Sequence, residues 1–270
     1  NYVCVICKNA ISKTGECCGI NYEIKKDQIE VSYDKLLYEN YRSDYMLNKI
    51  LNNNGHLSYL YLPAGSISLS DRKDVKSFGE YIETNCKLGK LIDIGCGTME
   101  IPGYLQSLAN DNRIILYGLD PIRDIVLKGK KVISCAEYIP FSNGYFDTII
   151  FATSIDHVCS LSATIKESHR ILSDNGKMIL WHFYPMGFSL RKEFLRKLSI
   201  TLKSGYNAFR YCLYPEHNVV FNIPKGAIDP FHKEYISHRK LRSIAKENGF
   251  QMSDSTSYDG NSYFTTFTKL

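Results

Sequence analysis

The sequence predicts an α/β fold, with a doubly wound, mostly parallel sheet and helices on both of its faces. The first supporting observation is the stretch 90–98, Lys-Leu-Ile-Asp-Ile-Gly-Cys-Gly-Thr, which is typical of a buried strand that ends in a glycine turn. The second is the regular alternation of apolar strands and helical stripes over residues 101–183. The third is a pair of strands, 250–255 and 263–269, which we expect to form an antiparallel hairpin.

Each element follows from a local pattern. Before the glycine turn, apolar and aromatic residues recur at helical spacing over 33–51, and Asn-Asn-Asn-Gly at 52–55 predicts a loop. Ser70 and Asp71 are expected to cap a helix that runs through Ile82. The remaining expected elements are helix 101–108, strands 114–119, 132–134, 146–152 and 177–183, and helices 161–172 and 237–248.

The glycine turn is the expected ligand site. Gly95 and Gly97 let the backbone turn tightly and let a ligand approach it closely. Thr98 is expected to cap a helix that begins near Met99, whose first N–H groups would face that ligand. A strand, a glycine loop and a helix N-terminus together predict a nucleotide-type pocket.

Asp93 and Glu100 indicate which ligand this pocket takes. A dinucleotide loop requires a third glycine at position 100, where this chain has Glu100, and two carboxylates would repel a pyrophosphate. S-adenosylmethionine carries an ammonium and a sulfonium and no phosphate, so charge pairing with Asp93 favours it. An acidic residue followed by Gly-x-Gly resembles the first motif of the class I S-adenosylmethionine-dependent methyltransferases; the third glycine often seen in that family is Met99 here.

The resemblance covers about residues 70–270 and implies a Rossmann-like sheet of seven strands that finishes with the C-terminal hairpin. It also implies that Asp120, at the end of strand 114–119, accepts hydrogen bonds from the cofactor's ribose; capping a helix that begins at Pro121 is the alternative. Where the family commonly has an adenine-binding Asp, this chain has Cys135, so we expect the backbone around Ala136 to serve as the contact to the adenine instead. The residues expected to bind the cofactor are Asp93, Gly95, Cys96, Gly97, Asp120, Pro121, Ala136, Glu137 and Thr153.

The segment 153–158 follows the fourth strand at the sheet edge where ligands gather. The family often places a histidine there, beside the reactive methyl group. A hydroxyl or amine acceptor needs a base, whereas a carboxylate does not. His157 is the first candidate for that base, with Asp156 and His182 behind it. A hydrogen-bonded residue at the rim of the site is the alternative role for each of the three.

Four cysteines, Cys4, Cys7, Cys17 and Cys18, lie near the start of the chain. The Cys4-x-x-Cys7 spacing lets both thiolates reach one tetrahedral zinc ion, whereas the adjacent pair Cys17-Cys18 reaches the same ion only through a contorted turn. We therefore expect residues 1–30 to be a small cysteine-rich, zinc-ribbon-like module with a structural zinc, ahead of a methyltransferase domain at 31–270. A short hairpin with free thiols is the alternative.

Composition narrows the class of protein. The 270 residues are 44% hydrophobic, which is ample for a core, and their net charge of +5 is smaller than that of a dedicated nucleic-acid binder. No apolar run approaches the ~20 residues of a membrane span, and no secretory signal is visible. The nine cysteines are an odd number and scattered, which favours reduced thiols and a cytoplasmic protein without a membrane partner.

The expected reaction is methyl transfer from S-adenosylmethionine to a small-molecule or saccharide acceptor, with oxygen favoured as the methylated atom. The aromatic-rich stretch 186–232 is the expected insertion that covers the substrate. One alternative is a ribosomal RNA methyltransferase with a zinc-binding N-terminal module, against which the modest charge argues. The other is a catalytically silent methyltransferase fold that acts as a binding subunit, against which the retained Asp93 and Asp120 argue.

Overall fold

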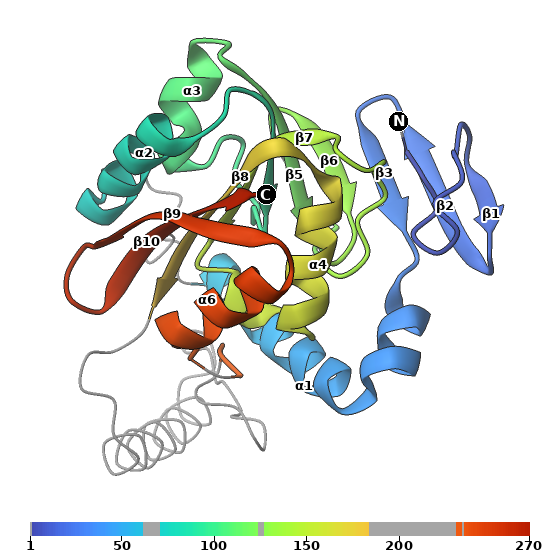
Figure 1. Cartoon of the computed structure of the whole chain (residues 1–270). Helices are drawn as coiled ribbons and strands as arrows, with labels where there is room; N and C mark the ends of the chain where they lie inside the picture. Colours follow the sequence, from blue (N-terminus) through green and yellow to red (C-terminus); the bar gives the residue numbers. More distant parts are fainter. Residues whose placement is uncertain (1, 62–70, 124–126, 184–230, 234) are drawn as a thin grey trace.

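The computed structural model describes residues 2–61, 71–123, 127–183, 231–233 and 235–270, shown in colour in Figure 1. Most of the expected insertion at 186–232 lies outside these residues. Ten strands of the described chain form one sheet, in the order β1-β2-β3-β6-β5-β4-β7-β8-β10-β9. The strands are β1 (Gly15–Cys17), β2 (Ile20–Lys25), β3 (Gln28–Val31), β4 (Gly89–Ile94), β5 (Ile114–Asp120), β6 (Lys130–Ile133), β7 (Phe146–Ala152), β8 (Leu172–Phe183), β9 (Phe250–Ser257) and β10 (Ser262–Lys269).

The centre of the sheet has the predicted topology. Strands β6, β5, β4, β7 and β8 run parallel to one another, and β10 lies antiparallel between β8 and β9. From β4 the chain order proceeds to β5 and β6 on one side and to β7 and β8 on the other, so the strand order reverses beside β4. Ligands of open α/β sheets bind at such a reversal. The predicted α/β sheet with an antiparallel C-terminal hairpin is confirmed.

Helices cover both faces of this sheet, as predicted. On one face, α2 (Lys73–Asn85) and α3 (Gln106–Asn110) bury side chains such as Phe78 against Leu91. On the other face, α4 (Leu161–Ile171) and α6 (His238–Glu247) pack in the cluster that holds Ile92, and both lie in front of the sheet in Figure 1. Successive strand residues thus enter opposite core layers. Within the described segments, no helix combines the length and apolar character that crossing a bilayer requires.

The sheet is longer at one edge than the predicted seven strands. β3 pairs in parallel with β6, and β2 and β1 follow it as an antiparallel meander (blue in Figure 1). Ile29 of β3 is fully buried and aligns with Val132 of β6. This pairing covers backbone groups of β6 that would otherwise form an open sheet edge. The cysteine-bearing segment is therefore continuous with the central sheet.

Helix α1 (Asp34–Tyr61) is bent at Tyr41, where φ is −139° and ψ is 40°. It continues through 52–55, so the predicted loop is wrong. The Asn52 side chain donates to Asn48 Oδ1 one turn earlier at 2.9 Å, and the asparagines are thus paired within the helix.

The helix predicted at Met99 also begins later. The next helical residues are η2 (Gly103–Leu105), followed directly by α3. Pro102 explains the delay, because proline disfavours helical backbone at the residue before it. Thr98 therefore caps no helix, and the turn around Gly95 and Gly97 stands without a helix N-terminus directly behind it.

Candidate active site

A cavity of about 690 Å³ lies at the carboxyl ends of β4, β5 and β7, with α1 forming part of its wall. Six of the residues expected to bind the cofactor line it: Gly95, Asp120, Pro121, Ala136, Glu137 and Thr153. The other three, Asp93, Cys96 and Gly97, do not line it. The buried Cys96 thiol instead lies against Gly118 of β5.

Gly95 makes the turn at the end of β4 possible. Its φ is +80°, and an added Cβ would lie 2.4 Å from Cβ of Ser154. Ser154 in turn donates from Oγ to the carbonyl of Ile94 at 2.5 Å. Only glycine lets the β4 turn and the loop after β7 approach this closely. Together they form one wall of the cavity.

Asp120 holds the glycine turn from the neighbouring strand. Its Oδ2 accepts from the Gly97 N–H at 2.9 Å, and its Oδ1 accepts from the Ile122 N–H at 3.0 Å. The side chain also lines the cavity, and each carboxylate oxygen can accept more than one hydrogen bond. The carboxylate can therefore fix the turn and still accept from a ligand hydroxyl.

Asp93 lies in the core beside the cavity turn and does not line the cavity. Its carboxyl is fully buried, and the Tyr104 hydroxyl donates to Oδ2 at 2.7 Å. Oδ1 has no hydrogen-bond partner within the described part of the chain. Burial raises the pKa of Asp93 to about 7 and the charge of Asp120 adds to this, against the bond from Tyr104. Because Asp93 does not line the cavity in this structure, its charge pairing with the cofactor stays a prediction.

Glu137 and Thr153 also line the cavity. Glu137 is buried, its Oε1 accepts from the Ser160 N–H at 3.0 Å, and burial raises its pKa. Thr153 has φ +56°, which is a genuine outlier for a β-branched residue. Its N–H donates to the Trp181 carbonyl at 2.8 Å, which anchors this strained residue to β8.

The predicted base, His157, lies in η3 (Ile155–His157) and lines the cavity, and the structure brings it together with Asp156. His157 Nε2 is 3.8 Å from Asp156 Oδ1, and His232 Nε2 is 3.3 Å from Asp156 Oδ2. Sequence reasoning missed His232 as a site residue. It lies far along the chain within the expected insertion, and no local motif marks it.

His182, the third candidate, lies elsewhere. It is buried in β8, does not line the cavity, and stacks on Tyr263 and His238 at ring distances of 5.7 and 5.9 Å. Burial lowers its pKa to about 4, with the charge of His238 adding to the effect. The structure therefore separates His182 from the cavity that His157 lines.

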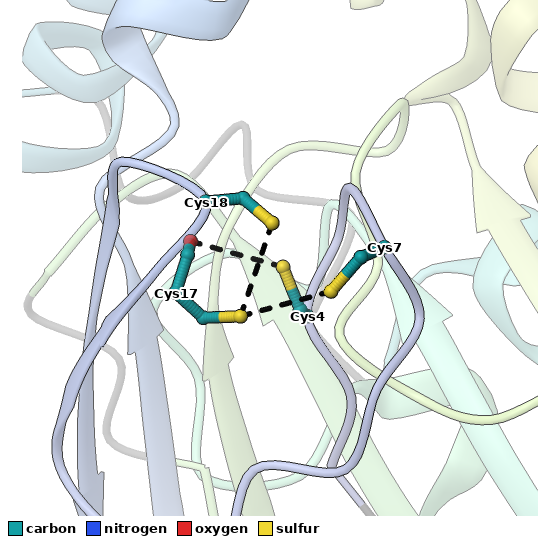
Figure 2. Close-up of side chains that lie close together, drawn as sticks. All are labelled: Cys4, Cys7, Cys17 and Cys18. Carbon is teal, nitrogen blue, oxygen red and sulfur yellow. Dashed lines mark hydrogen bonds between the residues drawn. The ribbon is translucent and has the colours of Figure 1, made fainter.

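The four N-terminal cysteines converge, as Figure 2 shows. All four Sγ atoms lie within 4.8 Å of one another, with Cys7 and Cys17 at 3.7 Å and Cys17 and Cys18 at 4.0 Å. Zn–S bonds of 2.3 Å in a tetrahedron put the sulfurs about 3.8 Å apart. The cluster therefore has the dimensions of a Cys₄ zinc site.

The local backbone explains how adjacent cysteines reach one point. Cys18 and Gly19 have φ of +54° and +75°, which turns the chain sharply between β1 and β2. Burial opposes ionisation of Cys4, but hydrogen bonds from the Tyr22 hydroxyl and the backbone near Cys7 lower its pKa to about 6. The thiolate is the form that binds metal.

Comparison with known proteins agrees with this geometry. Residues 92–180, from β4 into β8, match the family model described as a methyltransferase domain. The chain is 27% identical over 143 residues to the ubiquinone/menaquinone biosynthesis C-methyltransferase UbiE of Geotalea uraniireducens, covering 46% of this chain and 60% of that protein. It is 25% identical to the uncharacterized protein MJ1252 of Methanocaldococcus jannaschii, covering 64% and 66%. The chain thus spans about two thirds or less of the length of these two relatives.

Among solved structures, the chain resembles the PH0226 protein from Pyrococcus horikoshii OT3, with a TM-score of 0.52 and 19% identity, covering 79% of this chain and 99% of that one. At that identity the likeness shows the fold alone. The predicted resemblance to the class I S-adenosylmethionine-dependent methyltransferases is confirmed for the domain around β4–β8.

Proposed function

We propose that this chain, which carries a methyltransferase domain over residues 92–180, transfers a methyl group from S-adenosylmethionine to a small-molecule acceptor. The observation that carries the proposal is the cavity at the carboxyl ends of β4 and β5, within the matched domain. Its volume of about 690 Å³ is in the range of small-molecule sites.

The residues present fit this cofactor. Asp120 and Glu137 are acidic and line the cavity near the Gly95 turn, which suits a cationic ligand better than a pyrophosphate. In the proposed assignment, Asp120 accepts from the ribose and the segment Ala136–Glu137 contacts the adenine. S-adenosylmethionine supplies a methyl group already activated by its sulfonium. The chain then has to align the acceptor and exclude water.

The wall of the cavity on α1 favours a hydroxylated acceptor such as a saccharide. Asn48, Asn52 and Asn53 line it together with Tyr33 and Tyr45. Amide side chains offer donors and acceptors side by side, which suits an acceptor rich in hydroxyl groups. We therefore propose oxygen as the methylated atom.

A hydroxyl must lose its proton as the methyl group arrives. We propose that Asp156 and His157 promote this loss, because His157 lines the cavity on the loop after β7 and Asp156 precedes it in η3.

We also propose that Cys4, Cys7, Cys17 and Cys18 hold a structural zinc ion. The support is their sulfur spacing, the left-handed turn at Cys18 and the low pKa of Cys4. A reducing compartment such as the cytoplasm would keep these thiols available for the metal. None of the four lines the cavity, so the zinc would support the structure at the β1–β2 turn and take no part in methyl transfer.

The cysteine cluster is also the observation that favours the runner-up, an RNA methyltransferase with a zinc-binding N-terminal module. A single experiment separates the candidates. The purified chain is first titrated with S-adenosylmethionine and with NAD⁺ by calorimetry, and is then incubated with methyl-labelled cofactor and either hydroxylated small molecules or ribosomal RNA.

We expect the chain to bind S-adenosylmethionine and not NAD⁺. We expect the labelled methyl group to appear in a small hydroxylated acceptor. Label only in RNA would select the runner-up. Cofactor binding without transfer to any acceptor would favour a silent binding subunit, and failure to bind the cofactor would overturn the proposal.

A further inference from the structure

Three potential metal ligands meet at one end of the cavity. The ligating atoms of Asp156, His157 and His232 all lie within 4.8 Å of one another. η3 supplies Asp156 and His157, and the described residues 231–233 supply His232. Both imidazole rings line the cavity, and their centroids are 5.0 Å apart. A metal ion held by these three side chains would therefore be accessible to a ligand in the cavity.

The spacing is that of ligands around one small cation. Nitrogen and oxygen ligands bind such an ion at about 2.0–2.2 Å, which puts neighbouring ligand atoms about 3.0–3.5 Å apart. The 3.3 Å between His232 Nε2 and Asp156 Oδ2 fits this geometry as it stands. The 3.8 Å between His157 Nε2 and Asp156 Oδ1 requires a shift of only a few tenths of an ångström.

Asp156 supplies a second, independent observation. Its side chain is only 9% exposed, and Oδ1 is buried without a hydrogen-bond partner in the part of the chain that the structure describes. Buried polar atoms are nearly always paired, because leaving one unpaired is costly. A cation between this carboxylate and the two imidazoles would satisfy Oδ1. Two histidines and one carboxylate are a recurrent ligand set for divalent transition metals that keep open coordination positions.

The backbone of this cluster is held in place from α1. The Asn48 side-chain amide donates to the carbonyl of His157, and the His157 N–H donates to the Ser154 carbonyl at 3.1 Å. Ser154 is the residue that packs against Gly95. These contacts connect the cluster to the Gly95 turn, beside which we propose that the cofactor binds.

We propose that Asp156, His157 and His232 bind a divalent first-row transition cation that receives the hydroxyl of the methyl acceptor. The inference rests on the proposed methyl transfer. A hydroxyl on such a cation is more acidic than a free one, so its proton passes to solvent water. The oxygen then forms a bond to the methyl carbon while the carbon–sulfur bond breaks, and the electron pair of that bond stays on sulfur. His157 serves this step as a ligand and does not take the proton itself.

Manganese is the probe that separates this site from the cysteine cluster, because Mn²⁺ prefers nitrogen and oxygen ligands over thiolates. The full chain is treated with chelator and titrated with Mn²⁺, and electron paramagnetic resonance follows the free ion. We expect saturable binding of about one equivalent, as for one three-ligand site. His232→Ala and Asp156→Asn should each weaken it at least tenfold. His169→Ala, a histidine outside the cavity, and Cys17→Ser should leave it unchanged.

Calorimetry with S-adenosylmethionine on the same samples distinguishes the two proposals. Intact cofactor binding without Mn²⁺ binding, or Mn²⁺ binding that both cluster variants retain, would overturn the cation site and leave methyl transfer standing. Mn²⁺ binding without cofactor binding would overturn methyl transfer instead. If His232→Ala does not fold, the isosteric Asp156→Asn gives the answer alone.

Discussion

Asp120 connects the glycine turn to the cavity through the hydrogen bonds it accepts from Gly97 and Ile122. If it also accepts from the ribose, Asp120→Ala should weaken S-adenosylmethionine binding by about 1.5–3 kcal/mol, the value of a hydrogen bond to a charged group. Calorimetry on the purified variant measures this. Asp111→Ala is the matched control, because Asp111 is exposed near the opposite end of β5. Unchanged affinity in a folded Asp120 variant would remove this residue from the cofactor site.

Asp93 should make stability depend on pH. Its pKa is about 7 in the folded chain and ordinarily about 3.9, so between pH 4 and 7 the unfolded chain loses the proton that the folded chain keeps. The free energy of unfolding should therefore fall as pH rises through this window, by up to about 4 kcal/mol from this group. The side chain of the Asp93→Asn variant cannot ionise. The free energy of unfolding of this variant should therefore not show this part of the decrease with pH. Urea unfolding at pH 5 and pH 8 tests it, and equal pH dependence in both proteins would contradict the buried, protonated Asp93.

At the scale of single elements, the β1–β2 segment depends on its cysteines. We expect the purified chain to carry about one equivalent of zinc, which Cys7→Ser or Cys17→Ser should remove and Cys86→Ser, at the end of α2, should not. Elemental analysis measures the metal. Because none of the four cluster cysteines lines the cavity, the metal-free variants should still bind S-adenosylmethionine. A metal-free native protein whose thiols all react with a mild alkylating reagent would exclude the zinc site.

Helix α1 and the glycine turn show where local patterns stop being informative. Periodicity predicted the start of α1, but the Asn-Gly run at 52–55 has low helix propensity and was predicted as a loop. Side-chain bonding within the helix and packing over the cavity override that propensity. After the turn, the two glycines predicted the ligand site, whereas Pro102 moved the following helix away from it.

At the scale of the whole molecule, the parallel centre of the sheet could be predicted because each strand is a short apolar run with its own turn signals. The pairing of β3 with β6 could not, since it joins segments about a hundred residues apart and neither carries a motif. The same holds for His232, which only the folded chain brings beside Asp156. Six of the nine residues predicted to bind the cofactor line the cavity, and the sequence could single them out because they lie in a few short motifs at strand ends.

The longer sheet leads to a last prediction, that residues 1–30 do not unfold independently of the rest. Ile29 is fully buried at the β3–β6 junction, so Ile29→Ala should cost about 2–5 kcal/mol and lower the melting temperature by roughly 4–20 °C. Trp181, the single tryptophan of the chain, is buried in β8 across the sheet and reports the melting of the central strands. Ile6→Ala is the control, because Ile6 lies in the same segment but is 45% exposed. If the segment were an independent module, Ile29→Ala would leave the Trp181 fluorescence transition unchanged. We expect instead that Ile29→Ala moves the Trp181 fluorescence transition to lower temperature. The strands share one ladder of hydrogen bonds, so they should melt in one transition.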